Sequence, residues 1–245
     1  MAETLISPGV LARENDQSFI TQQPVQVGAA IVGPAVKGPV EQPTVVTSYS
    51  DYQNRFGTTF ESGSLDYTFF TSIAAYNYFN NGGNTLLVTR VANGSFTSAT
   101  ASIANDTAQA FKLKTISEGT IMNSDGTLGS DGQLSTGTAD NVRWEISFAD
   151  TGSGTFNLLV RQGNDLTNDK IVLETYAGVS LDPFQDNYIA KVIGDMKQTL
   201  VSDADGNKYL EVTGSYANKS NYVYVDEVLS PTPNFFDNVG NAASD

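Results

Sequence analysis

The stretch Asn81-Gly82-Gly83-Asn84-Thr85-Leu86-Leu87-Val88 joins the end of a helix to a buried strand. Glycine and asparagine end helices, and a short apolar run directly after a glycine turn is typical of a strand buried on both faces. Upstream, between Ser64 and Gly82, large apolar residues fall at helical spacing, which predicts a helix that buries Phe69, Ile73, Tyr76 and Phe79. This pattern of helix followed by buried strand is the starting point for the rest of the chain.

Two strands are expected before this helix. The first is Val25–Val32, which a Gly-Pro turn follows, and the second is Thr44–Tyr49. Ser50 and Gln53 then match a capping box, which predicts a short helix that ends at Gly57. Residues 24–92 therefore predict a β-β-α-β core unit in which the helix lies across a mixed sheet.

Residues 93–230 are expected to form a β-rich outer domain. Its first section, 93–140, is rich in small and polar residues and predicts a flexible surface segment with one strand at Ala110–Ile116. From 141 to 176, apolar and polar residues alternate, which predicts an antiparallel meander in which Trp144, Ile146 and Phe148 face one way.

The last part of this domain predicts a short helix and a hairpin. The helix should cover Tyr188–Ile193 and end at Gly194. The hairpin should pair Lys208–Val212 with Tyr222–Val225, because both runs alternate and Asp205-Gly206 favours a turn.

The two ends of the chain have no clear periodicity. Residues 1–23 predict an extended N-terminal arm, because Pro8-Gly9 interrupts any helix. Residues 231–245 are interpreted as a tail or a severed linker. The expected fold class is thus α+β: an extended arm, an α/β sandwich unit made of a mixed sheet with a covering helix, and a β-rich antiparallel domain.

Composition excludes several kinds of chemistry. The chain has 245 residues, with 13 Lys and Arg against 27 Asp and Glu, for a net charge of −14. Nucleic-acid binding normally requires a basic face, so direct binding of nucleic acid is not expected. The chain has neither histidine nor cysteine, which removes the usual catalytic bases, thiolate nucleophiles and preferred zinc ligands. The N-terminus lacks a signal peptide and no long apolar run is present, so membrane insertion is not expected.

Three patterns resemble sites but are better explained by structure. Asp203–Glu211 begins like a calcium loop, yet Gly and Glu stand at the wrong positions for an EF-hand. Gly28–Gly38 lacks the lysine and hydroxyl residue of a phosphate loop. Glu145 and Glu174 are expected on the polar faces of strands, where solvated carboxylates are the default. The protein is therefore predicted not to be an enzyme, with no catalytic, cofactor-binding or metal-binding residues and no cofactor.

An ordered set of phrases resembles the N-terminal region of contractile phage tail sheath proteins. Each phrase alone is weak, but together they cover much of the chain: Leu5–Val10, Gly28–Gly33, Tyr78–Gly83, Ser117–Thr120, Phe156–Arg161, Leu181–Pro183, Asn187–Ile189 and Ile193–Asp195. Proteins of this family usually continue well beyond 245 residues, and nothing here resembles their C-terminal half. The resemblance thus implies either a fragment or a half that is supplied elsewhere.

The resemblance implies a structural role in the virion tail, with synthesis in the host cytoplasm. Many copies would polymerise helically around an inner tube, and contraction would drive the tube through the host envelope for genome ejection. The implied partners are neighbouring sheath subunits, the tail tube protein, the baseplate and the tail terminator. Strand exchange between subunits would use apolar residues of the arm: Ile6, Val10, Leu11, Phe19 and Ile20.

Other interpretations remain open at this point. The polar loops and the tyrosines also suit a carbohydrate- or receptor-binding β-domain of a virion. A calcium-dependent adhesin module would depend on Asp203–Glu211 alone, and an enzyme would have to use carboxylates without histidine.

Overall fold

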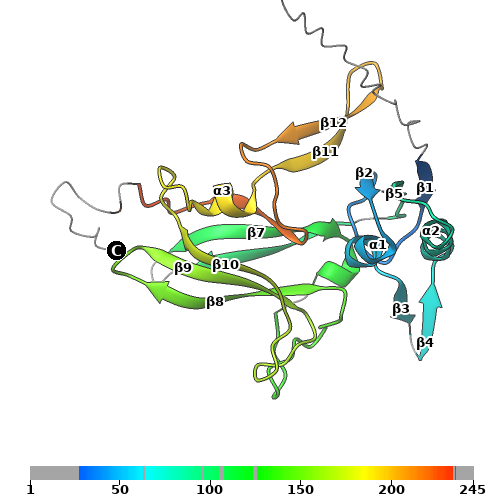
Figure 1. Cartoon of the computed structure of the whole chain (residues 1–245). Coiled ribbons are helices and arrows are strands. Elements are labelled where there is room, and N and C mark those ends of the chain that lie inside the picture. Colours follow the sequence, from blue (N-terminus) through cyan, green and yellow to red (C-terminus); the bar gives the residue numbers. More distant parts are fainter. Residues whose placement is uncertain are drawn as a thin grey trace, which may run out of the picture.

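A computed structural model describes residues 28–62, 64–94, 96–104, 108–123, 126–233 and 235. These residues are mainly β, with several antiparallel sheets and few helices, which agrees with the expected class at this coarse level. Figure 1 shows a smaller unit of strands and helices at one end and a longer β-rich part beside it. The whole N-terminal arm and most of the C-terminal tail lie outside the described residues.

The smaller unit is a three-stranded mixed sheet with two helices on one face. Its order is β1-β5-β2: β1 (Ala29–Gly33) runs parallel, and β2 (Pro43–Val46) antiparallel, to the central β5 (Leu86–Arg90). The helices are α1 (Tyr49–Phe56) and α2 (Phe70–Asn80). Between sheet and helices lies a core of fully buried or nearly buried side chains: Ala35, Val46, Tyr52, Phe56, Ala75, Leu86 and Val88.

Helix α1 begins slightly earlier than predicted. Its cap is Ser48, whose hydroxyl accepts a hydrogen bond from the backbone N–H of Asp51 at 3.1 Å, so the prediction that Ser50 caps the helix was wrong. Arg55 pairs with Asp51 one turn away at 2.7 Å. The helix ends at Gly57, as expected, with a φ of 71° that suits glycine.

The predicted start of the next helix was wrong. Leu65–Thr68 forms a strand, β4, which pairs with β3 (Thr59–Ser62) in a hairpin, and α2 begins only at Phe70. The ring of Phe60 stacks on Tyr67 at 5.6 Å and on Phe69 at 5.0 Å. These aromatic contacts favour the extended hairpin over a first helical turn.

Helix α2 buries only part of the predicted apolar face, on which Phe79 packs half-buried against the core. Thr71, Ser72 and Ala75 are buried, whereas Ile73 and Tyr76 are exposed. Small residues are needed there because the helix lies close to β1. A Cβ at Gly33 would lie 2.5 Å from the Thr71 methyl carbon, so bulky side chains on this face of the helix would not fit.

The β-rich part contains two facing antiparallel sheets. One has the order β13-β7-β6 and the other β10-β9-β8. Their strands are β6 (Ser98–Ala104), β7 (Gln109–Glu118), β8 (Val142–Asp150), β9 (Thr155–Gln162), β10 (Val172–Ser180) and β13 (Val223–Val228). Phe111 of β7 stacks on Phe156 of β9 at 5.6 Å, and helix α3 (Ile189–Ile193) packs against the same core.

The predicted hairpin joins different strands from those expected. β12 (Lys208–Thr213) pairs with β11 (Lys197–Ser202), while β13 pairs with β7. The Asp203 carboxylate closes the β11–β12 turn by accepting hydrogen bonds from the backbone N–H groups of Asp205 and Asn207 and from the Asn207 side chain. This local closure favours the shorter connection.

The start of the predicted tail is attached to the β-rich part. The backbone N–H of Thr232 bonds to the Leu181 carbonyl at 3.1 Å, and the backbone N–H of Phe235 bonds to the Asp182 carboxylate at 3.4 Å. Residues 236–245 lie outside the described residues.

Truncation of the smaller core gives a first test. Phe56 is fully buried and stacks on Tyr52, so Phe56→Ala should lower the free energy of unfolding by about 3–5 kcal/mol. Urea denaturation would measure this. The control Phe148→Ala removes a ring that is 58% exposed on β8 and should change stability by less than about 1 kcal/mol. Equal losses in the two variants would contradict this assignment of the core.

Candidate interaction surfaces

The two parts of the chain meet around the buried side chain of Arg90, at the end of β5. Its guanidinium donates hydrogen bonds to three carbonyl oxygens: those of Ala35 at 3.1 Å, Gly38 at 2.7 Å and Glu118 at 2.6 Å. Burial lowers the pKa of Arg90, and the charge of Glu118 partly offsets this. Arg90 therefore connects the loop after β1 to the end of β7.

Further polar contacts cross the same junction. Backbone N–H groups of Gly38 and Val40 donate to the side chains of Ser117 at 3.2 Å and Glu118 at 3.0 Å. Lys37 forms an ion pair with Asp140 at 3.1 Å. Gly38 has a φ of 106°, and a Cβ there would lie 2.6 Å from the Phe56 ring, so this position requires glycine. These contacts fix the orientation of the two parts.

One face of the sheet of the smaller unit is left uncovered by the described residues. The residues on it form two rows across the three strands, and all are uncharged: Ala30, Val32, Pro43, Val45, Leu87 and Thr89. Val32 is 70% exposed and Val45 is 53% exposed. We call these six residues the open sheet face. Its apolar character is unusual for a solvated surface.

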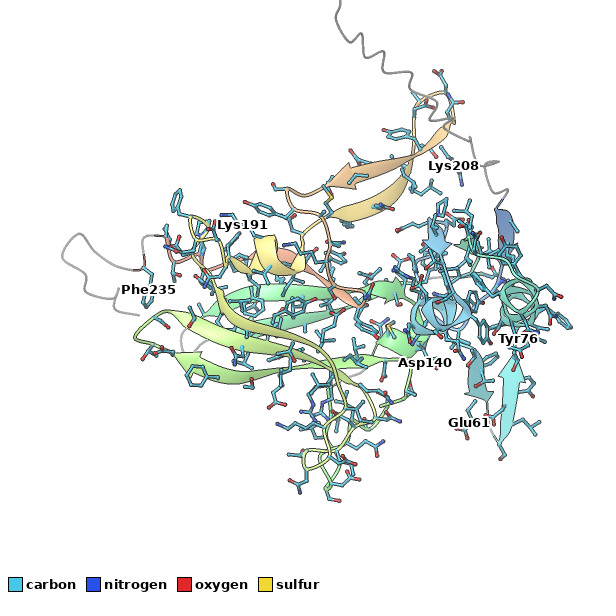
Figure 2. The ribbon with its side chains drawn as sticks, in the orientation of Figure 1. Glu61, Tyr76, Asp140, Lys191, Lys208 and Phe235 are labelled. Carbon is cyan, nitrogen blue, oxygen red and sulfur yellow. The ribbon has the colours of Figure 1, made fainter. Side chains whose placement is uncertain are left out.

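The outer face of α2 carries large exposed apolar side chains beside the uncharged Asn77 and Asn80, and no described residue covers it. Exposed Phe70, Ile73, Ala74 and Tyr76 lie on it, and Phe70 is 86% exposed. The helix contains no charged residue. Figure 2 shows Tyr76 at the outside of the smaller unit. We call these four residues the outer helix face.

Two hairpins project from the body (Figure 1). Among the described residues, β3–β4 and β11–β12 are each two-stranded sheets with no third strand. In β3–β4 the carboxylates of Glu61 and Asp66 stand directly opposite each other, which is unfavourable for an isolated hairpin. In β11–β12, Tyr209 and Val212 are exposed. Isolated hairpins are marginally stable, and their free edges can accept a strand from a neighbour.

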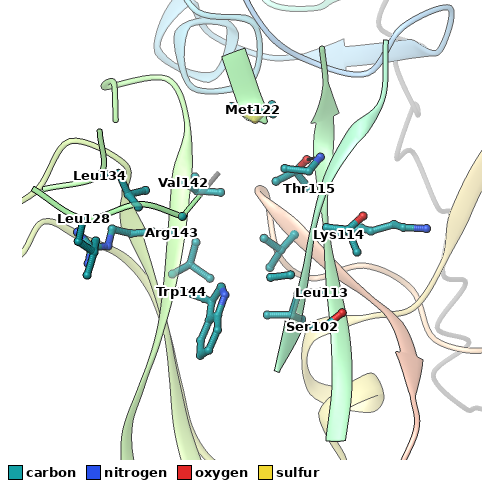
Figure 3. A pocket seen from close by; sticks show the side chains of 16 residues that line it. Ser102, Leu113, Lys114, Thr115, Met122, Leu128, Leu134, Val142, Arg143 and Trp144 are labelled. Atoms are coloured by element: carbon teal, nitrogen blue, oxygen red, sulfur yellow. Dashed lines mark hydrogen bonds between the residues drawn. The ribbon is translucent and has the colours of Figure 1, made fainter. Parts of the chain in front are cut away.

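A cleft of about 460 Å³ opens between the two sheets of the β-rich part. Figure 3 shows Val142 and Trp144 of β8 on one wall and Leu113 and Thr115 of β7 on the other. Lys114 points away from the cleft (Figure 3) and pairs with Asp226 at 2.9 Å. Trp144 is 39% exposed and lies on β8, the edge strand of its sheet, where the cleft opens.

The structure keeps the two candidate carboxylates apart. Glu145 and Glu174 lie on β8 and β10, which are separated by β9. Glu145 pairs with Arg161 at 2.6 Å and with Lys170 at 2.7 Å. Glu174 accepts hydrogen bonds from Tyr176, Ser220 and the backbone of Asn221. Each carboxylate thus has its own structural partners.

The structure also bears on the proposed calcium loop and on membrane insertion, but not on the arm residues. The Asp203 oxygens are engaged by their own turn, as described above, and no group of three or more Asp or Glu within the described residues could hold a metal ion. No helix in this part of the chain is long and apolar enough to cross a membrane. The arm residues Ile6, Val10, Leu11, Phe19 and Ile20 lie outside the described residues, so their contacts stay a prediction.

Sequence reasoning missed the junction and both uncovered faces. A signal for the junction was present, because Arg90 directly follows an apolar strand, where a charge must find buried partners.

Comparison with known proteins does not place this chain in a family. The sequence matches no protein-family model, and no curated protein shows a significant match.

Loss of the Arg90 side chain should loosen the junction. Arg90→Ala leaves buried carbonyl groups without a donor, so the opening free energy of nearby amides should fall by about 2 kcal/mol or more. Hydrogen exchange at the N–H groups of Val40 and Glu118 would measure this, because both bond across the junction. The control Lys112→Ala breaks the surface pair with Glu227 and should leave these amides unchanged. Unaltered exchange in Arg90→Ala would contradict the proposed role of Arg90.

Glu145 should contribute to acid sensitivity. Its hydrogen bond from Lys170, together with that from Arg161, lowers the pKa of Glu145 against the effect of partial burial. Stability from this group is therefore present above its unfolded pKa of about 4.3 and is lost as pH falls through the lower folded pKa. Glu145→Gln should flatten the loss of stability on acidification in pH-dependent denaturation. Asp186→Asn, at an exposed position, serves as control; an equal flattening there would argue against the Glu145 effect.

Proposed function

We propose that this chain is a structural subunit of a contractile phage tail sheath. Copies polymerise helically around an inner tube in the virion tail, and contraction drives the tube through the host envelope for genome ejection. The subunit is made in the host cytoplasm. It uses no cofactor and catalyses no reaction: the energy stored during assembly is released when interfaces between subunits repack.

The observation that carries this proposal is the pair of uncovered apolar faces on the smaller unit. A chain with a net charge of −14 has ample charged side chains for its surface, yet the open sheet face and the outer helix face carry none. Exposed apolar patches of this kind mark sites of protein–protein contact. The ordered resemblance to tail sheath proteins then favours a polymer over a simple dimer.

The rigid junction supports the same function. In a contracting sheath, subunit bodies rotate and slide while flexible arms keep them connected, so each body must keep its shape. The hydrogen bonds of Arg90, Val40 and Gly38 join the two parts through specific polar geometry. Such contacts resist sliding better than an apolar contact, because any shift leaves buried polar groups unpaired.

The arm residues Ile6, Val10, Leu11, Phe19 and Ile20 are proposed to exchange between neighbouring subunits by strand addition. The tail tube protein, the baseplate and the tail terminator are the further partners that the resemblance implies. Direct contact with nucleic acid does not form part of the proposal, because the chain is strongly acidic. Membrane insertion does not form part of it either.

The cleft beside Trp144 favours a second candidate, a carbohydrate- or receptor-binding β-domain of a virion. A half-exposed indole beside a cleft of about 460 Å³ offers a stacking surface for a sugar ring. Glycan binding by a chain that stays monomeric, with loss of binding in Trp144→Ala, would favour this candidate over the sheath.

Deletion of the arm tests the sheath proposal. The full chain should form rings or tubes as its concentration rises, and a chain lacking residues 1–23 should not, because strand addition from the arm is lost. Negative-stain electron microscopy across a concentration series would show this. A matched full-length variant replaces Ile6, Val10, Leu11, Phe19 and Ile20 by serine, which keeps the length of the arm. Full-length chains that stay monomeric at every concentration would contradict self-assembly, and equal assembly by all three chains would contradict the role of the arm.

A further inference from the structure

Helix α2 buries small side chains against the sheet and carries large exposed apolar side chains on its other side, which no described residue covers. Thr71, Ser72 and Ala75 pack on the sheet, while Phe70 and Ile73 face outward. Large apolar side chains that gather on one exposed helix face mark a site of protein–protein contact. The outer helix face therefore has no covering partner within the part of the chain that the structure describes.

Among the residues that the structure describes, no helix covers the second face of the sheet. β1 and β5 form a parallel pair, and parallel strands are normally covered by helices on both faces. Here α1 and α2 both lie on the same face, against the core around Val46 and Val88. The layer that is missing from the open sheet face is thus an apolar helix, which is the kind of surface that the outer helix face presents.

The distribution of charge favours a second copy of this chain as the partner that covers the open sheet face. Two chains that each carry −14 repel one another, so they associate best where neither surface adds charge. All six residues of the open sheet face and all four of the outer helix face are uncharged. Within one chain the two faces cannot meet, because they lie on opposite sides of the same unit, with the core between them.

The difference between the two faces indicates a repeated contact rather than a closed dimer. The exposed side chains of the two faces together offer on the order of 500 Å² of apolar area. A stable pair of proteins usually buries at least about 1,200 Å², so this contact adds to the exchange of arms and does not hold two copies together alone. Every copy inside a row buries both of its faces, one against each neighbour, and a contact between two different faces propagates rather than closes.

We propose that the outer helix face of one copy packs on the open sheet face of the next copy. The smaller units then form a continuous row in which α2 acts as the second helical layer of the neighbour's sheet. This inference deepens the proposed sheath function and rests on it, because it names the surfaces through which sheath subunits meet in addition to the arm. The contact is heterologous: helix face meets sheet face, never its own kind.

Cysteine cross-linking tests this contact directly, because the chain has no cysteine of its own. The double variant Ala74→Cys with Leu87→Cys places one thiol on each face. Under assembly conditions with a short bismaleimide reagent, we expect a ladder of covalent oligomers on a denaturing gel. Each single variant should give no cross-linked product. A second double variant, Ala74→Cys with Ser147→Cys on β8, serves as the matched control and should give no ladder.

Variants must keep their fold, which the melting temperature checks. If Leu87→Cys unfolds, Val45→Cys replaces it, because Val45 lies directly opposite Leu87 on the same face. Phe70→Glu adds a second measurement: it should abolish assembly, whereas Phe148→Glu, at an exposed site on β8, should not.

The outcomes separate this inference from the proposed function. Tubes in the microscope without a ladder from the double variant would overturn the helix-on-sheet contact and leave the sheath proposal standing. Cross-linked dimers from Ala74→Cys alone would also overturn it, because they would show a symmetric contact. Monomers in the microscope with no ladder would overturn both proposals.

Discussion

The burial of one guanidinium group determines how the two parts of this chain are arranged. Arg90 lies among backbone carbonyl groups of Ala35, Gly38 and Glu118, and a buried cation is tolerated only when its donors are satisfied. Hydrogen bonds are directional, so the loop after β1 and the end of β7 must keep one relative position. The smaller unit and the β-rich part consequently present their surfaces at a fixed angle.

The two parts differ in how completely they bury their apolar side chains. The β-rich part has its own core between two sheets, which includes Phe111, Leu158 and Val225. The smaller unit has its own core around Tyr52 and Phe56, but the described residues leave two of its faces with exposed apolar side chains. Projecting hairpins at β3–β4 and β11–β12 add free strand edges (Figure 1). A rigid body with apolar faces on one unit and free edges around it suits a part that is completed by its neighbours.

The sequence predicted those elements that depend on local patterns. The strands around Ile31 and Val88 and the helix that stops at Gly57 were found from apolar runs and glycine signals. The predictions were wrong where tertiary contacts determine the conformation of a segment or the pairing of strands. Leu65–Thr68 was included in the predicted helix, but the stacking of Phe60 on Tyr67 and Phe69 holds it in an extended hairpin. Strand partners such as β13 and β7 are far apart in the chain, and alternation alone does not indicate which strands pair.

The exposed face of α2 was also not predicted, because it too depends on tertiary packing. Large apolar residues at helical spacing were interpreted as the buried face of α2, because burial is their usual state. The structure instead buries Thr71, Ser72 and Ala75, since close packing on β1 leaves room only for small side chains. Patterns in one chain cannot distinguish a face that packs inside the subunit from one that packs between subunits.

The strand order of the smaller sheet also affects when the unit can form. β1 and β2 do not pair with each other; both pair with β5, which is synthesised about 40 residues after β2. Such pairing has high contact order, which slows folding because a long loop must close first. During synthesis on the ribosome the sheet therefore cannot exist until β5 has emerged. The open sheet face, to which all three strands contribute, is therefore complete only after β5 has been made.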